Sequence, residues 1–79
     1  MLVQNIKNTS DRLPPDEYDS WIAFWEDKTG EEAPSLTVGG HVIKADSTDE
    51  AWYIAAITKA QNNSTIPYEY HGELAKLHD

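Results

Sequence analysis

Cysteine is absent from this chain of 79 residues. Its absence excludes disulfides and thiolate metal ligands, which are the staples that small domains commonly add to a limited core. A chain of this length is expected to form a single domain, residues 1–79, and to bury only about 60% of the surface that its unfolded form exposes. Side-chain packing must therefore supply the stability, and the three tryptophans are the largest side chains available for it.

Long apolar runs and basic residues are also scarce. No apolar run approaches the ~18 residues of a membrane-spanning helix, and "MLVQNIKNTSD" lacks the basic-then-apolar order of a signal peptide. We therefore expect a cytoplasmic protein that does not bind membranes. Six basic and 14 acidic residues give a net charge of −8, which argues against direct contact with nucleic acid because phosphates require Lys or Arg. The same charge favours attraction to a basic protein surface.

The segment "LPPDEYDSWIAFWEDKTGEE" predicts an amphipathic helix over residues 15–29. Pro14 and Pro15 suit a first helical turn, and Gly30 suits the position that follows the last turn. Apolar residues recur at helical spacing along one face: Tyr18, Trp21, Ile22 and Trp25. Residues 1–13, polar with scattered apolar positions, predict a flexible arm or an edge strand.

After a loop at 31–35, residues 42–44 predict a strand, with Gly39 and Gly40 interrupting the segment before it. The apolar run 51–57 predicts a second strand that returns antiparallel to the first. A short helix is expected from about Ala56 to residues 62–63, then a short strand or loop and a helical turn at 73–78. The sequence thus predicts an α+β fold, an N-terminal amphipathic helix packed on a β-hairpin followed by a short helix. Its expected core is Trp21, Trp25, Trp52, Ile54 and Ile57.

The stretches "GGHV", "DSTDEAWYI" and "TKAQNN" carry a resemblance. Together they resemble the ββα-metal, or HNH-type, treble-clef frame, and more closely a group of small bacterial proteins with "GAHV" and "WYIVPLCKxCN" segments. The resemblance implies a treble-clef-like fold in which Thr58 and Gln61 stand at two cysteine positions. Neither residue is a useful zinc ligand, so we expect a metal-free form without cofactor. Thr58 is then better interpreted as the cap of a packed helix, with Asn62 near the end of that helix.

The same resemblance places His41 at the position of the general base of HNH nucleases. Gly40 stands where that family usually has a metal-binding acid, and such a nuclease needs its divalent ion. We therefore expect no enzyme, with a residual HNH-type nuclease using His41 as the alternative. A half-buried strand histidine bonded to backbone, or a surface histidine, is the favoured interpretation of His41. His71 and His78 have no partner at metal-ligand spacing.

Acidic residues are concentrated in residues 16–32, which contain seven acids and one lysine. On a helix, Asp16, Asp19, Glu26 and Asp27 would lie off the tryptophan face and form one acidic stripe. One interpretation of such a stripe is purely structural: it is the helix face that is exposed to solvent. The functional interpretation is a surface that mimics nucleic-acid phosphates or docks on a basic groove.

We therefore predict a non-enzymatic, acidic protein-binding module, with a structural or regulatory subunit as a further alternative. Small acidic chains with a degenerate enzyme or zinc-finger frame are common among phage and mobile-element inhibitors, including anti-CRISPR proteins. The predicted partner is a basic surface of a nucleic-acid-binding protein, such as a nuclease or CRISPR effector. The predicted partner-binding residues are Asp16, Glu17, Asp19, Glu26, Asp27, Glu31 and Glu32.

Overall fold

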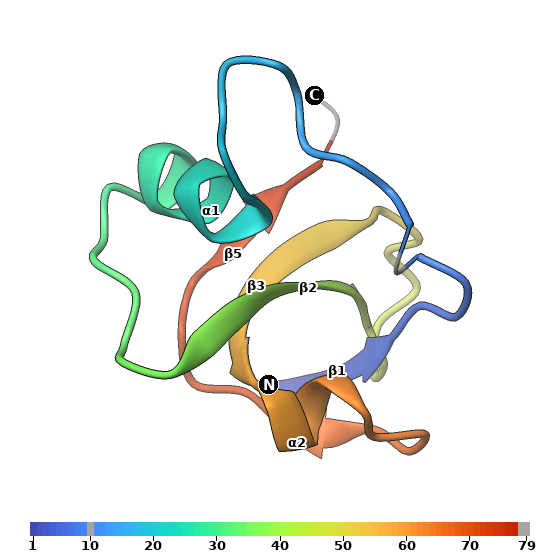
Figure 1. Ribbon diagram of the computed structural model, residues 1–79. Coiled ribbons are helices and arrows are strands. Elements are labelled where there is room, and N and C mark those ends of the chain that lie inside the picture. The colour runs from blue at the N-terminus through green and yellow to red at the C-terminus, as the bar shows by residue number, and fades with distance from the viewer. Residues whose placement is uncertain (10, 78–79) are drawn as a thin grey trace.

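The computed structural model describes residues 1–9 and 11–77. Within them, a five-stranded antiparallel sheet has the strand order β4-β1-β2-β3-β5, and two short helices accompany it (Figure 1). The α+β class is confirmed, but the sheet extends well beyond the predicted hairpin. The elements are β1 (Leu2–Asn5), α1 (Trp21–Thr29), β2 (Thr37–Lys44), β3 (Tyr53–Thr58), α2 (Lys59–Asn62), β4 (Tyr68–Glu69) and β5 (Leu74–Lys76).

The β2–β3 hairpin is confirmed as the centre of the fold. The side chains of β3 enter two apolar clusters in turn, because successive strand residues point to opposite faces of the sheet. Both of its faces are covered, which explains the unbroken apolar run in the sequence. The predicted core residues Trp25, Ile54 and Ile57 are buried, whereas Trp21 and Trp52 are half-buried. They do not share one cluster, because Ile54 and Ile57 lie on opposite faces of β3. One buried cluster contains Val3, Val42, Tyr53, Ala55, Ile57 and Tyr70, and the other, beneath α1, contains Phe24, Trp25, Ile54, Ala56 and Ala75.

The glycine pair lies inside β2 rather than interrupting it. A Cβ atom on Gly39 would lie 2.6 Å from the Cβ of Trp21 and 2.7 Å from its carbonyl carbon. On the other face, a Cβ atom on Gly40 would lie 2.4 Å from the Cδ1 of Ile57. Glycine inside a strand commonly marks a site where another chain segment approaches closely. The pair therefore lets α1 pack on one face of β2 and Ile57 on the other.

Helix α1 begins at Trp21, six residues later than predicted. Ser20 has an extended conformation and its side chain accepts a hydrogen bond from the Ala23 N–H at 3.1 Å, which makes it the N-cap. Pro15 instead belongs to a turn in which the Tyr18 N–H donates to its carbonyl oxygen at 2.9 Å. The predicted end is confirmed, since Gly30 has a φ of 73° and its N–H donates to Glu26.

Residues 2–5 of the predicted N-terminal segment 1–13 form neither an arm nor an edge strand, and residue 10 lies outside the described residues. β1 pairs with β2 on one side and with β4 on the other, so it lies inside the sheet. Val3 is fully buried, and the N-terminal ammonium donates to the Tyr70 carbonyl at 3.1 Å and forms an ion pair with Glu69 at 3.2 Å. The N-terminus is therefore anchored at the β4 side of the sheet.

The segment "TKAQ" forms a capping box at the start of α2. The Thr58 hydroxyl accepts from the Gln61 N–H at 3.1 Å, and the Gln61 side chain accepts from the Thr58 N–H at 3.0 Å. The predicted cap at Thr58 and helix end near Asn62 are confirmed. The helix starts at Lys59 rather than near Ala56, because Ala56 is buried within β3.

The tail contains strands in place of the predicted helical turn. β4 confirms the short strand or loop that was expected there, whereas the turn predicted at 73–78 is wrong. β5 pairs with β3 in the register Ala75 to Ile54, and the buried Ala75 packs beneath α1. Pairing with β3 and burial under α1 therefore outweigh the helical preference of this segment. Residue 78, at the end of the predicted turn, lies outside the described residues.

Candidate functional site

The predicted acidic residues do not form a stripe along one helix. Asp16 and Glu17 lie in a turn and Asp19 in a bend, all before α1 begins, so the stripe prediction is wrong. The other four are divided between the helix and the loop that follows it. Glu26 and Asp27 lie on α1, and Glu31 and Glu32 lie between α1 and β2.

Two of these acids hold the surrounding chain in place. The Glu26 carboxylate accepts from the Ala33 N–H at 2.8 Å and so fixes the loop after α1. Asp27 accepts a hydrogen bond from the Tyr18 hydroxyl, and this bond is the main cause that raises the pKa of Tyr18 to about 12. The Tyr18 ring also meets the Phe24 ring edge-on at 5.4 Å, so the turn before α1 folds back along the helix.

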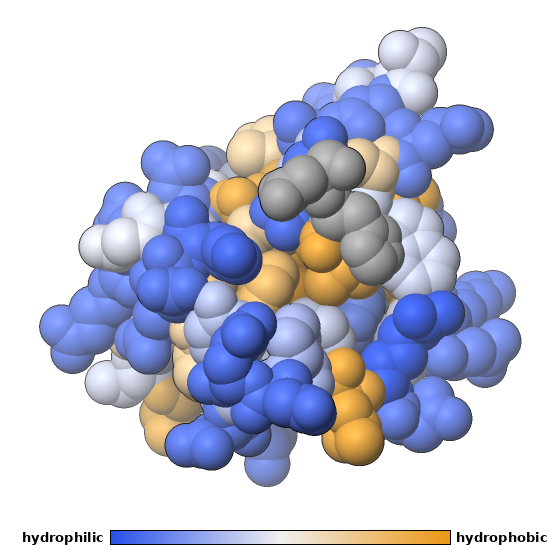
Figure 2. Space-filling view, turned by 90° about the horizontal axis from the view of Figure 1, so that it is seen from above, coloured by the Kyte–Doolittle hydropathy of each residue, from blue (hydrophilic) through white to orange (hydrophobic). Residues whose placement is uncertain are grey.

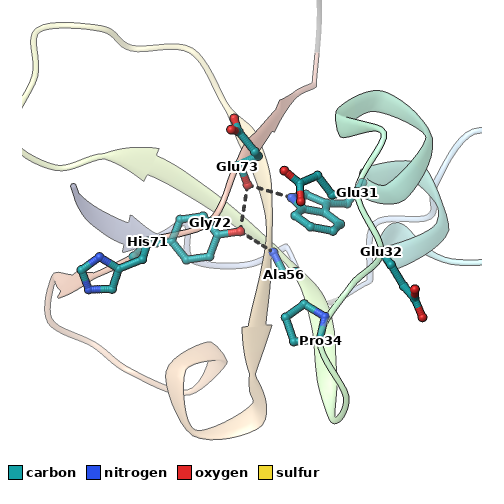
Figure 3. A pocket seen from close by; sticks show the side chains of 9 residues that line it. Glu31, Glu32, Pro34, Ala56, His71, Gly72 and Glu73 are labelled. Carbon is teal, nitrogen blue, oxygen red and sulfur yellow. Dashed lines mark hydrogen bonds between the residues drawn. The ribbon is translucent and has the colours of Figure 1, made fainter.

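The loop after α1 and the segment before β5 enclose a cleft of about 280 Å³ (Figure 3). Among the described residues that line it are three glutamates and a histidine, but no Lys or Arg. Figure 3 shows the Glu31 and Glu73 side chains on the upper side of the cleft, while Glu32 and His71 point away from it. We call this hollow the acidic cleft; its lining is Trp25, Glu31, Glu32, Pro34, Ala56, Tyr70, His71, Gly72 and Glu73.

The floor of the acidic cleft is a hydrogen-bonded network that fixes the backbone of Glu73. The Glu73 carbonyl accepts from the Trp25 indole N–H at 2.8 Å and from the Tyr70 hydroxyl at 2.8 Å (Figure 3). The Tyr70 oxygen in turn accepts from the Ala56 N–H at 3.1 Å. Burial raises the pKa of Tyr70, which therefore keeps its donating proton at neutral pH. The predicted burial of Trp25 is confirmed, since 3% of the residue is exposed.

Glu73 is the residue of this site that the sequence prediction missed. It is far from residues 16–32 along the chain, and only the pairing of β5 with β3 brings it beside the loop after α1. The turn before Glu73 brings Gly72 close to Tyr70. A Cβ atom on Gly72 would lie 2.6 Å from the Tyr70 hydroxyl, so the turn there requires glycine.

His41 is a strand residue, as predicted, but it is more deeply buried, with 5% of the residue exposed. Its ring meets the Trp21 ring edge-on at 4.7 Å, and its Nε2 has no hydrogen-bond partner among the described residues. Burial is the main cause that lowers the pKa of His41, with the charge of Arg12 adding to it. The imidazole is therefore neutral at neutral pH.

Metal ligands are not gathered anywhere in the described part of the chain: it has no group of three His, Asp or Glu residues that could hold an ion. His71 lines the acidic cleft, and His78 lies outside the described residues. None of the helices in residues 1–9 and 11–77 is long and apolar enough to cross a membrane. No protein-family model, curated protein or solved structure matches the chain.

Proposed function

We propose that this protein is a non-enzymatic binding module that docks its acidic surface on a basic surface of a nucleic-acid-binding protein. The observation that carries the proposal is the acidic cleft, where Glu31 and Glu73 lie on one side and Glu32 lies at the edge, on a chain of net charge −8. A Lys or Arg side chain of the partner fits such a lining, and arginine can bind a carboxylate through two parallel hydrogen bonds.

The rigidity of the acidic cleft supports the same proposal. Its floor is fixed by the bonds of Trp25 and Tyr70 to the Glu73 carbonyl, and its outer loop by the bond between Glu26 and Ala33. A site that is already ordered loses less conformational freedom when it binds. Glu26 and Asp27 hold the surrounding chain in place, and Asp27 is exposed, so it can also contact a partner together with the other exposed acids.

The segment before α1 adds three further exposed acids. Asp16, Glu17 and Asp19 lie in the segment that Tyr18 ties back along α1. Charges of one sign accelerate the encounter with an oppositely charged surface, and the effect weakens as salt is added. Carboxylates arranged on a rigid surface occupy the role of phosphates, so the protein acts as a competitor of nucleic acid. A phage or mobile-element inhibitor of a nuclease or CRISPR effector is the form of activity that fits.

The chain order supports a metal-free ββα, treble-clef-like frame as the finer description of the fold. The β2–β3 hairpin leads directly into α2, and the capping box of Thr58 and Gln61 stands where the resembling proteins have two cysteines. In that frame the alternative function is a nuclease that uses His41. The burial of its Nε2 opposes this role, because a general base must reach the water that it activates.

The proposal is tested with two doubly charge-reversed variants. Glu31→Lys with Glu73→Lys reverses the acidic cleft, while Asp46→Lys with Glu50→Lys makes the same change of charge at exposed positions of the β2–β3 connection. The partner is captured from a lysate of the natural host with the wild-type chain, purified, and titrated with all three proteins.

We expect the cleft variant to bind this partner at least about tenfold more weakly, because a repulsive pair replaces each attractive contact. The control variant should stay within about threefold of wild type, since rim charges act mainly on the association rate. Equal weakening in both variants would show that only net charge matters and would refute docking through the acidic cleft.

A further inference from the structure

Leu36, in the turn before β2, is an unusual residue for its backbone conformation. Its φ angle is 63°, in the left-handed region where the Cβ atom of an L residue crowds the backbone. Among the described residues, positive φ angles otherwise occur only at Asn8 and Gly30, which are residue types that tolerate this conformation. Asparagine or glycine would therefore suit the backbone at position 36 better than leucine does.

The Leu36 side chain also adds almost nothing to the packing of the fold. It is 92% exposed, the highest value among the exposed large hydrophobic residues. Exposed apolar side chains are ordinary in themselves, and Figure 2 shows apolar residues among the hydrophilic ones that cover most of the face seen from above. Leu36 differs because leucine is unfavourable there both for the backbone and for the contact with water. Neither loss is offset within the fold, so the reason for leucine lies outside it.

The turn holds Leu36 beside the acidic cleft. Pro34 lines that cleft, and its carbonyl oxygen accepts a hydrogen bond from the Thr37 hydroxyl at 2.6 Å. Thr37 is the first residue of β2, and on the other side of the turn the Ala33 N–H donates to the Glu26 carboxylate at 2.8 Å. The chain is therefore fixed on both sides of Leu36, which is displayed two residues from the wall of the acidic cleft.

Charge decides what can cover this leucine. The side chains of Glu31 and Glu73 lie on one side of the neighbouring cleft, on a chain of net charge −8. A second copy of the chain would bring two such acidic surfaces together, which like charges oppose. A basic protein surface is attracted instead, and burial of an exposed leucine against its apolar atoms is favourable.

We propose that Leu36 is an apolar docking contact, which enters an apolar hollow of the basic partner protein beside the Lys or Arg side chain that occupies the acidic cleft. This role rests on the proposed function and adds a second requirement to the partner's surface. The basic patch of the partner borders an apolar hollow that accommodates one leucine side chain. Charge then accelerates the encounter, while the burial of Leu36 slows dissociation.

The first test needs only the protein itself. Leu36→Asn should leave the midpoint of urea unfolding at or above that of wild type, because asparagine tolerates a positive φ and is better solvated. A midpoint clearly below that of wild type would show that Leu36 stabilises the fold and would overturn the proposal. In sedimentation, a wild-type dimer that Leu36→Asn abolishes would assign this leucine to self-association and would overturn it as well.

The second test uses the purified partner of the charge-reversal experiment as the probe, titrated with Leu36→Asn and Leu13→Asn at low and at high salt. Leu13 provides the matched control, since it is 86% exposed but lies in the segment before α1. We expect Leu36→Asn to raise the Kd at least about tenfold at both salt concentrations, because salt does not screen an apolar contact. Leu13→Asn should stay within about threefold of wild type.

Comparison with the charge-reversed cleft variant separates the two proposals. If Leu36→Asn binds as tightly as wild type while Glu31→Lys with Glu73→Lys binds weakly, docking through the acidic cleft stands and the role of Leu36 is refuted. Equal weakening by Leu36→Asn and Leu13→Asn would refute that role too, because any exposed apolar residue would then have the same effect. If the charge-reversed variant binds as wild type does, or if no basic partner is captured, the proposed function fails and the role of Leu36 fails with it.

Discussion

Replacement of Gly40 by alanine should destabilise the fold mainly through a clash with the Ile57 side chain. The new Cβ atom would lie 2.4 Å from the Cδ1 of Ile57, whereas two carbon atoms prefer a separation of about 3.5–4.0 Å. Ile57 is fully buried, so its side chain cannot move aside freely. Overpacking of this kind costs about 1–3 kcal/mol of unfolding free energy.

The substitution Ile57→Val removes the obstructing Cδ1 atom. Alone it should cost about 0.5–1.5 kcal/mol, the usual loss for one buried methyl group. In the double variant the alanine methyl takes the space that Cδ1 leaves, although a contact of 3.1 Å with Cγ1 of residue 57 remains. The double variant should therefore be more stable than the sum of the single changes predicts, by at least about 1 kcal/mol.

The assay is urea unfolding followed by tryptophan fluorescence, with the unfolding free energy extrapolated to water. Gly39→Ala combined with Ile57→Val is the control pair, since Gly39 faces Trp21 on the opposite side of β2. That pair should be additive within about 0.3–0.5 kcal/mol. If the Gly40 pair were equally additive, β2 would not meet Ile57 as described, and the role assigned to the glycine pair would be refuted.

Three further predictions concern the face of the sheet beneath α1. Gly39→Ala should lower the unfolding free energy by about 3 kcal/mol, which is more than the loss expected for Gly40→Ala. The reason is that the new Cβ atom would lie 2.7 Å from the Trp21 backbone, which cannot move aside as a side chain can. Equal urea midpoints of the two variants would contradict this prediction. Trp25→Ala should lower the unfolding free energy by about 3–5 kcal/mol, because only 3% of Trp25 is exposed. An unchanged Tm would show that Trp25 does not belong to the core. Burial lowers the pKa of His41 below its ordinary 6.5, so the unfolded chain takes up the proton first and stability falls as the pH drops below about 6.5. Urea titrations between pH 7.5 and 5.5 should show this loss in wild type and a smaller one in His41→Gln, and identical profiles would refute it.

Features with a local cause were predictable from the sequence. The β2–β3 hairpin follows from apolar runs on either side of a polar turn, and Gly30 ends α1 because it adopts a positive φ of 73°. The cap at Thr58 likewise depends on residues three positions apart. In each of these elements the signal and the structure that it specifies lie within a few residues.

Features that depend on distant partners were not predictable in this way. β1 pairs Val3 with Lys44 and Leu2 with Glu69, and neither partner can be identified from the four-residue segment "LVQN". The predicted start of α1 followed from Pro14 and Pro15, which are only one kind of signal for a helix N-terminus. In the structure the N-cap is Ser20. The turn before it folds back along α1 through the contacts of Tyr18 with Asp27 and Phe24.

The candidate site was predictable only in part for the same reason. The acidic segment was evident from composition, and it supplies Glu31 and Glu32 to the acidic cleft. Glu73 and the fixed floor depend on the pairing of β5 with β3, which no local pattern indicates. The structural role of Glu26 required the position of the Ala33 N–H, which follows from the loop conformation.

The most direct test of the acidic surface is whether the purified partner can bind this protein and nucleic acid at the same time. A fluorescently labelled nucleic acid bound to the partner is titrated with the wild-type chain at low and at high salt. We predict stoichiometric displacement at low salt, weaker displacement at high salt, and little displacement by the variant with Glu31→Lys and Glu73→Lys. A stable ternary complex, or equal displacement by wild type and this variant, would contradict the proposal that the acidic cleft takes the place of phosphates.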